Sequence, residues 1–151
     1  MAEISDQPPT FKPTDYRPEE RLFVGYRKSD INEGTDKIEP NFFRFPDFSC
    51  NWERFSEAED VRLRENGLPT DGSISFLVKT AQYEKMATPC HDPTPKVYAH
   101  SEIRQLTDSE PLTFEPPRNR KLKSNNWSKS RRQEYRQNLV NNHKIEIEPT
   151  A

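Results

Sequence analysis

The stretch that decides the fold is residues 97–106, Val-Tyr-Ala-His-Ser-Glu-Ile-Arg-Gln-Leu. Apolar Val97, Ala99 and Ile103 fall at alternate positions, with Ser101 between them on the same side. The side chains on the opposite side are polar or amphipathic: Tyr98, His100, Glu102 and Arg104. A period of two is typical of a strand with one buried face. We therefore predict a strand here and a sheet around it.

Other segments supply the rest of that sheet. Residues 21–27 and 73–79 are rich in strand formers, and residues 41–48 form an aromatic strand or extended segment interrupted by Pro46. A capping box at Ser56 predicts a short helix over residues 56–65, which would pack on the aromatic cluster around it. Residues 127–141 have a weak apolar stripe and predict a second helix, capped by Asn125 or Asn126. Residues 144–148 alternate and could add a short edge strand.

These elements predict a small α+β fold with a mainly antiparallel sheet of about four short strands. The hydrophobic fraction of 30% and the 14 prolines indicate polar, poorly ordered ends around one compact domain. We divide the chain into a flexible Pro-rich leader, an α+β core, a Pro-rich linker and a basic arm, over residues 1–20, 21–106, 107–117 and 118–151.

The charge of the chain changes sign near Pro117. Residues 1–115 hold 14 Lys or Arg against 22 Asp or Glu, whereas residues 116–151 hold 9 against 3. An acidic body followed by a basic arm is typical of a protein that engages a partner. Arginine and lysine neutralise phosphates, and interleaved aromatic rings stack on unpaired bases or fill a partner's pocket. The expected binding residues are Arg118, Arg120, Lys121, Lys123, Trp127, Lys129, Arg131, Arg132, Tyr135 and Arg136.

The polar side of residues 98–104 is the candidate catalytic surface. His100 and Glu102 are neighbours there, and a histidine beside a carboxylate can act as general base or acid. Arg104 could hold a phosphate or carboxylate, with His91 and Arg54 assisting. The alternative is an ordinary solvated strand face with cross-strand charge pairs.

Other chemistries have less support. Cys50, Cys90, His91 and His100 are potential zinc ligands, but the chain has no Cys-x-x-Cys pair, so we expect no metal site and no cofactor. Cys90 beside His91 could be a nucleophile, although a lone loop cysteine usually is not. The four glycines are isolated, which excludes phosphate-binding loops and dinucleotide fingerprints.

Two functions follow from these patterns. The first is a small cytoplasmic, non-enzymatic accessory protein whose basic arm binds a larger protein or, through residues 118–136, nucleic acid. The second is a small metal-independent nuclease- or toxin-like enzyme that uses the His/Glu/Arg constellation. The sequence has no apolar run long enough to span a membrane and no signal peptide, so we expect no membrane partner. No family can be named from its motifs.

Overall fold

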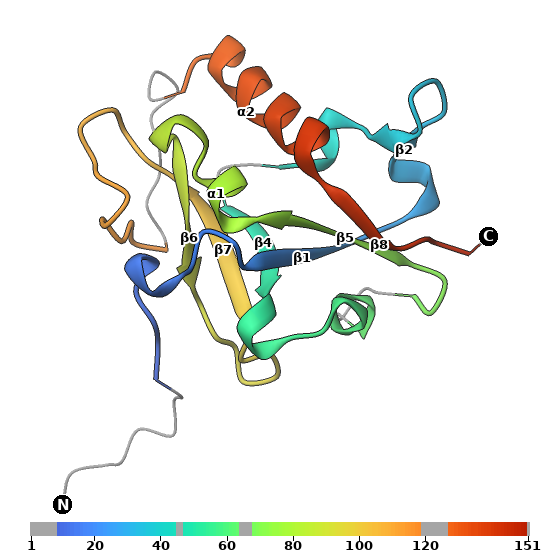
Figure 1. Cartoon of the computed structure of the whole chain (residues 1–151), viewed down its shortest axis with the longest axis horizontal. Coiled ribbons are helices and arrows are strands. Elements are labelled where there is room, and N and C mark those ends of the chain that lie inside the picture. The colour runs from blue at the N-terminus through green and yellow to red at the C-terminus, as the bar shows by residue number, and fades with distance from the viewer. Residues whose placement is uncertain (1–8, 45–46, 64–67, 119–126, 151) are drawn as a thin grey trace, which may run out of the picture.

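The computed structural model describes residues 9–44, 47–63, 68–118 and 127–150, and its centre is a six-stranded sheet (Figure 1). The strand order is β6-β7-β4-β1-β5-β8, and every neighbouring pair is antiparallel. The strands are β1 (Arg21–Tyr26), β4 (Asp47–Trp52), β5 (Gly72–Leu77), β6 (Ala87–His91), β7 (His100–Gln105) and β8 (Lys144–Ile147). A separate hairpin pairs β2 (Ile31–Asn32) with β3 (Lys37–Ile38). The predicted α+β class with a mainly antiparallel sheet is confirmed.

One face of the sheet, which we call the core face, is apolar. Leu22 of β1 lies opposite Trp52 of β4 and Phe76 of β5, and none of the three side chains is exposed to solvent. The alternation of apolar residues along each strand puts them on this face. Burial of each such side chain stabilises the fold by about 1.5–3 kcal/mol.

Helix α2 (Lys129–Asn142) covers the core face together with the short α1 (Val78–Ala81), on the same side of the sheet (Figure 1). Tyr135, Leu139 and Val140 are its buried residues. Their spacing of four and five positions places them on one side of the helix. The predicted helix is confirmed to within two residues at each end. Its N-cap is Ser128, whose hydroxyl accepts a hydrogen bond from the Arg131 N–H at 3.1 Å. The predicted caps, Asn125 and Asn126, lie outside the described residues.

The N-terminal segment, residues 9–20, also lies on the core face. Tyr16 stacks on Trp52 with ring centroids 3.8 Å apart, and its hydroxyl is hydrogen-bonded to Ser101. Phe11 meets the edge of Trp52 at 5.5 Å. The segment contains one short 3₁₀ turn, η1 (Pro13–Asp15). Phe11 and Tyr16 are therefore bound by the chain's own core.

The sheet has six strands, so the prediction of about four was wrong. Strand β6 contains Pro89 and has no alternating pattern, but it is an edge strand, where a missing N–H costs no ladder bond. The chain also adds β8 at the other edge, where the sequence allowed a strand. The aromatic segment was expected to be a strand over residues 41–48, but it begins with a 3₁₀ turn, η3 (Pro40–Phe42), and β4 starts only at Asp47.

The helix expected over residues 56–65 is a 3₁₀ helix, η5 (Ala58–Leu63). Asp60 rather than Ser56 accepts the exposed Glu57 N–H, at 2.8 Å. Ser56 instead accepts from the Asn51 side-chain amide at 3.3 Å. This segment lies over the second face of the sheet, and η4 (Glu53–Phe55) connects β4 to it.

Candidate functional site

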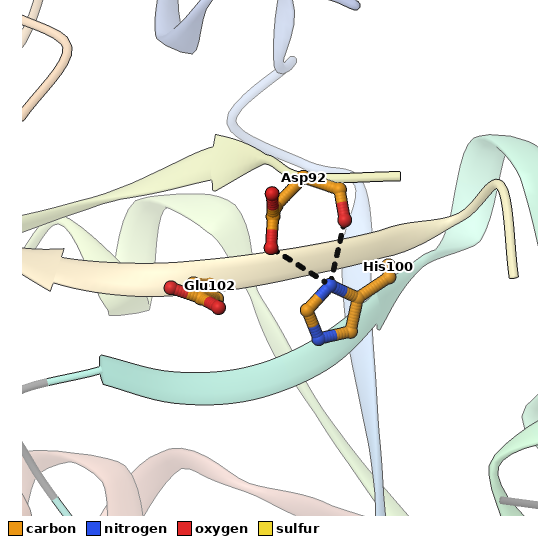
Figure 2. A group of neighbouring side chains, drawn as sticks. All are labelled: Asp92, His100 and Glu102. Carbon is orange, nitrogen blue, oxygen red and sulfur yellow. Dashed lines mark hydrogen bonds and ion pairs between the residues drawn. The ribbon is translucent and has the colours of Figure 1, made fainter. Parts of the chain in front are cut away.

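The second face of the sheet carries a histidine held by its neighbour across the β6–β7 turn. His100 Nδ1 lies 2.7 Å from the backbone oxygen of Asp92 and 3.4 Å from its carboxylate Oδ2. A carbonyl oxygen only accepts, so Nδ1 must carry the proton. In the neutral ring the lone pair is then on Nε2, which lies on the side of the ring away from Asp92 (Figure 2). This is the arrangement by which proteins fix a histidine tautomer.

Local backbone structure explains why Asp92 lies there. The Asp92 N–H donates to the His100 carbonyl at 2.9 Å, which extends the β6–β7 ladder by one bond. The intervening loop, residues 93–99, is closed by a turn in which Thr94 and Val97 exchange backbone hydrogen bonds. The prolines at 93 and 95 restrict the backbone of this loop. Asp92 and His100 therefore belong to one stiff hairpin.

A chain of alternating charges continues from His100 along the same face. Arg118 lies 3.4 Å from Asp92 and 3.7 Å from Glu102, and Arg104 lies 3.4 Å from the other oxygen of Glu102. Arg104 also donates to the Pro116 carbonyl at 2.6 Å. The side chains of Glu102 and Arg104 are only 8% and 7% exposed. Buried charges of this kind are stable only when paired.

Asp92, His100 and Glu102 are also spaced as metal ligands, since one ligand atom from each lies within 4.8 Å of the others. One observation argues against a metal there. The Arg118 guanidinium already bridges the two carboxylates that would have to bind the ion. The protein's own cation therefore neutralises this carboxylate pair.

His100 lines a half-open pocket of about 920 Å³ between the sheet and the segments that follow β4 and β6. The floor is polar, because Asn51 lies opposite His100 in the β4–β7 register. The walls are apolar and aromatic, with Phe55 against Tyr98 at 4.8 Å. Lys96 also lines the pocket, is exposed and has no ion-pair partner among the described residues. The other lining residues include Phe23, Gly25, Ser49, Ser56, Asp60, Val61, Thr94 and Val97.

The predicted catalytic constellation is divided between the two faces of the sheet. His100, Glu102 and Arg104 lie together, but Arg104 is occupied by Glu102 and Pro116. His91 is 4% exposed on the core face, where Nδ1 accepts from the Phe11 N–H and Nε2 contacts the Tyr98 carbonyl. Arg54 lies over the Trp52 ring and donates twice to Glu20 at 2.9 Å. His91 and Arg54 therefore hold the N-terminal segment.

The two cysteines are buried and free. Burial raises the pKa of the Cys90 thiol to about 12 and raises that of Cys50 further above its ordinary value. A thiol that stays protonated is a poor nucleophile. Neither cysteine is a candidate for covalent catalysis in this fold.

The predicted basic arm is largely integrated into the fold. Trp127 and Tyr135 are buried, at 2% and 0% exposed, and donate to backbone carbonyls. Arg131 pairs with Asp108 at 3.0 Å. Arg132 and Arg136 donate to the carbonyls of Trp127 and Phe43. Lys129 is exposed, Arg118 belongs to the site above, and Arg120, Lys121 and Lys123 lie outside the described residues.

Sequence reasoning missed the pocket and the bridging role of Arg118. Nothing in the spacing of Ser49, Asn51 or Lys96 shows that a loop and a 3₁₀ segment enclose a space beside His100. Asp92 lies close to His100 because it directly follows β6, which pairs with the strand of His100, and β6 has no strand pattern of its own in the sequence.

Comparison of the chain with protein-family models, with curated proteins and with solved structures finds no match in any of the three. Within the described residues, no helix has the length and apolar character needed to cross a membrane. The function must therefore be argued from the geometry of the site.

Proposed function

We propose that the chain is a small enzyme that acts on a phosphate ester in the pocket, with His100 as its general base. The observation that carries the proposal is the fixed Nδ1–H tautomer of His100 at the pocket wall. A polar, concave site with one oriented histidine is the usual starting point for assigning acid–base chemistry.

The charges and rings at the pocket favour a substrate with an anionic group and a flat ring. Lys96 has no ion-pair partner among the described residues, and an exposed lysine attracts phosphate as a point charge. Phe55, which is 39% exposed, and Tyr98 supply ring surfaces on which a base could stack. Single-stranded RNA combines both features.

RNA also supplies its own nucleophile. His100 Nε2 would take the proton of a ribose 2′-hydroxyl, whose oxygen then bonds to the adjacent phosphorus as the bond to the 5′-oxygen breaks. The departing oxygen takes a proton in return, from the imidazolium or from water. The Asp92 carboxylate, 3.4 Å from Nδ1, stabilises the imidazolium that forms.

The test is cleavage of a fluorescent single-stranded RNA in the presence of EDTA. We expect turnover by the wild-type chain and a loss of about 100-fold or more for His100→Gln, since general base catalysis contributes about 10²–10⁴-fold. His143→Gln is the matched control, because His143 is half-buried beside α2 and does not line the pocket. Both variants should keep the wild-type melting temperature. Absence of turnover by the wild-type chain, or full activity of His100→Gln, would contradict the proposal.

The first hypothesis, a basic region that binds a larger protein or nucleic acid, stays a prediction. Its exposed contributors among the described residues are Lys129 and Arg118, and the latter is 64% exposed.

A further inference from the structure

The two edges of the main sheet differ in how they are covered. Every residue of β6 is buried at one edge. At the other edge Lys144 and Ile145 of β8 are exposed, and Ile145 is 36% exposed although it lies opposite the fully buried Ile74. No strand lies beyond β8 among the described residues. An open edge presents a row of backbone donors and acceptors to another chain.

The side chains of β8 alternate between charge and aliphatic bulk, and their order is self-complementary. Lys144 and Glu146 lie on the second face, where Ser75 of β5 is opposite Lys144 and donates to Glu146 at 2.7 Å. Within one chain Lys144 Nζ also lies 3.7 Å from Glu146 Oε1, so pairing with a second copy would redirect this ion pair. Ile145 lies between them on the core face, and the register with β5 shifts between Ile145 and Ile147. A two-fold axis through Ile145 of an antiparallel pair would bring Lys144 opposite Glu146 of the other copy, twice, and Ile145 opposite its own copy.

Other registers lose this match. A shift of one residue moves the aliphatic side chains of one copy to the charged face of the other. A shift of two residues brings Lys144 opposite Lys144 or Glu146 opposite Glu146, and like charges directly opposite are unfavourable. One register is therefore favoured on both faces.

We propose that a second copy of this chain pairs with β8 in that register, so that two sheets join into one across a two-fold axis. The pairing joins residues 144–146 of β8 in each copy, so the dimer is weak and forms at high protein concentration. The inference does not depend on the chemistry of the pocket, which is built from other strands.

The test is sedimentation equilibrium of the full chain at concentrations up to about 1 mM, which detects complexes with millimolar dissociation constants. We expect a monomer–dimer equilibrium for the wild type. Glu146→Lys and Lys144→Glu should each weaken dimerisation by about tenfold or more, since two attractive pairs become repulsive. The double variant Lys144→Glu/Glu146→Lys should restore it, because opposite charges again face each other.

Two controls keep the fold separate from the interface. Lys129→Glu reverses an exposed charge on α2 and should leave dimerisation unchanged. Glu146→Lys loses the hydrogen bond from Ser75, so far-UV circular dichroism checks that this variant is still folded. Glu146→Gln keeps an acceptor for that hydrogen bond and should weaken dimerisation only partly. A wild-type chain that is monomeric at the highest concentration overturns the proposal. So does a single reversal without effect, or a double variant that fails to recover.

Discussion

His91 is a buried ionisable side chain of the core face with both ring nitrogens hydrogen-bonded. It is 4% exposed, its Nδ1 accepts a hydrogen bond from the Phe11 N–H at 3.1 Å, and its Nε2 lies 2.7 Å from the Tyr98 carbonyl. Both bonds are made only by the neutral ring with its proton on Nε2. Desolvation lowers the pKa of His91 below its ordinary 6.5, and the hydrogen bond to the Tyr98 carbonyl and the nearby Asp92 offset this only in part.

We expect acid to destabilise the fold through this ring. Below about pH 6.5 the unfolded chain binds a proton that folded His91 resists. The free energy of unfolding therefore decreases as the pH is lowered, by at most about 1.4 kcal/mol per pH unit. Above that pH the contribution of the neutral ring is complete. Urea unfolding at pH 7.5 and 5.5 measures the change.

The comparison is with His91→Gln, which keeps an acceptor and a donor but does not titrate. The variant should lose less stability than the wild type between the two pH values. His143, whose pKa is also lowered by burial, remains in both proteins and contributes equally. Identical pH dependence of the two proteins would assign the acid sensitivity elsewhere.

His91 and His100 also show what a sequence can say about a site. Alternation correctly put His100, Glu102 and Arg104 on one side of a strand. His91 and Arg54 were added by residue type alone, and the fold places them on the opposite face. Which face a neighbouring segment presents depends on strand register, and register is decided by long-range pairing that one segment does not encode.

Helix α2 is the element whose role differs most from its composition. Its exposed surface is basic and polar, yet Tyr135, Leu139 and Val140 are buried against the sheet, and Trp127 just before it is 2% exposed. Four large apolar contacts from one short segment make it part of the core. Burying four such side chains stabilises the fold by about 6–12 kcal/mol as an upper estimate.

We therefore expect a chain ending at residue 118 to lose cooperative unfolding rather than only a binding surface. A domain of this size is stable by about 5–15 kcal/mol in total, so removing these contacts consumes most of it. Circular dichroism melting of the truncated chain is the measurement. Within the full chain, Leu139→Ala should cost about 2–5 kcal/mol, whereas Gln137→Ala on the exposed side should cost less than about 0.5 kcal/mol. A sharp melt of the truncated chain would show that α2 is dispensable.

Elements with a strong local sequence pattern were predicted correctly. Elements whose conformation depends on the segment that they pair with or pack on were missed. Strand β1 and helix α2 follow from strand propensity and an apolar stripe. Strand β6 contains Pro89 and has no alternation, and it is a strand because β7 pairs with it. The segment after Ser56 had a helix signal but forms η5, since a segment so short takes its shape from what it packs on.

On the scale of the whole molecule, the acidic and basic parts of the chain are joined by specific ion pairs. Arg118 bridges Asp92 and Glu102, and Arg131 meets Asp108. The excess positive charge is therefore partly used within the fold. Among the expected binding residues that the structure describes, Lys129 near the start of α2 and Arg118 are exposed to an external partner.

If that region binds nucleic acid, affinity for single-stranded RNA should fall with salt, with a logarithmic slope of about −0.7 for each phosphate contacted. Lys129→Glu should weaken binding, whereas the exposed Lys37→Glu on β3 should not. Fluorescence anisotropy between 50 and 200 mM salt is the measurement. An affinity for single-stranded RNA that does not change with salt would contradict nucleic-acid binding by this region and would favour a protein partner.

The central position of β1 has a consequence for how fast the chain reaches this structure. Residues 21–26 pair with residues 47–52 and 72–77, so the middle of the sheet forms only after two long loops have closed. Loop closure reduces chain entropy before those pairings can compensate for it. Such topologies fold in milliseconds to seconds rather than microseconds. Until then the aromatic strands are exposed, and the unfolded chain depends on its many charged residues to remain dispersed.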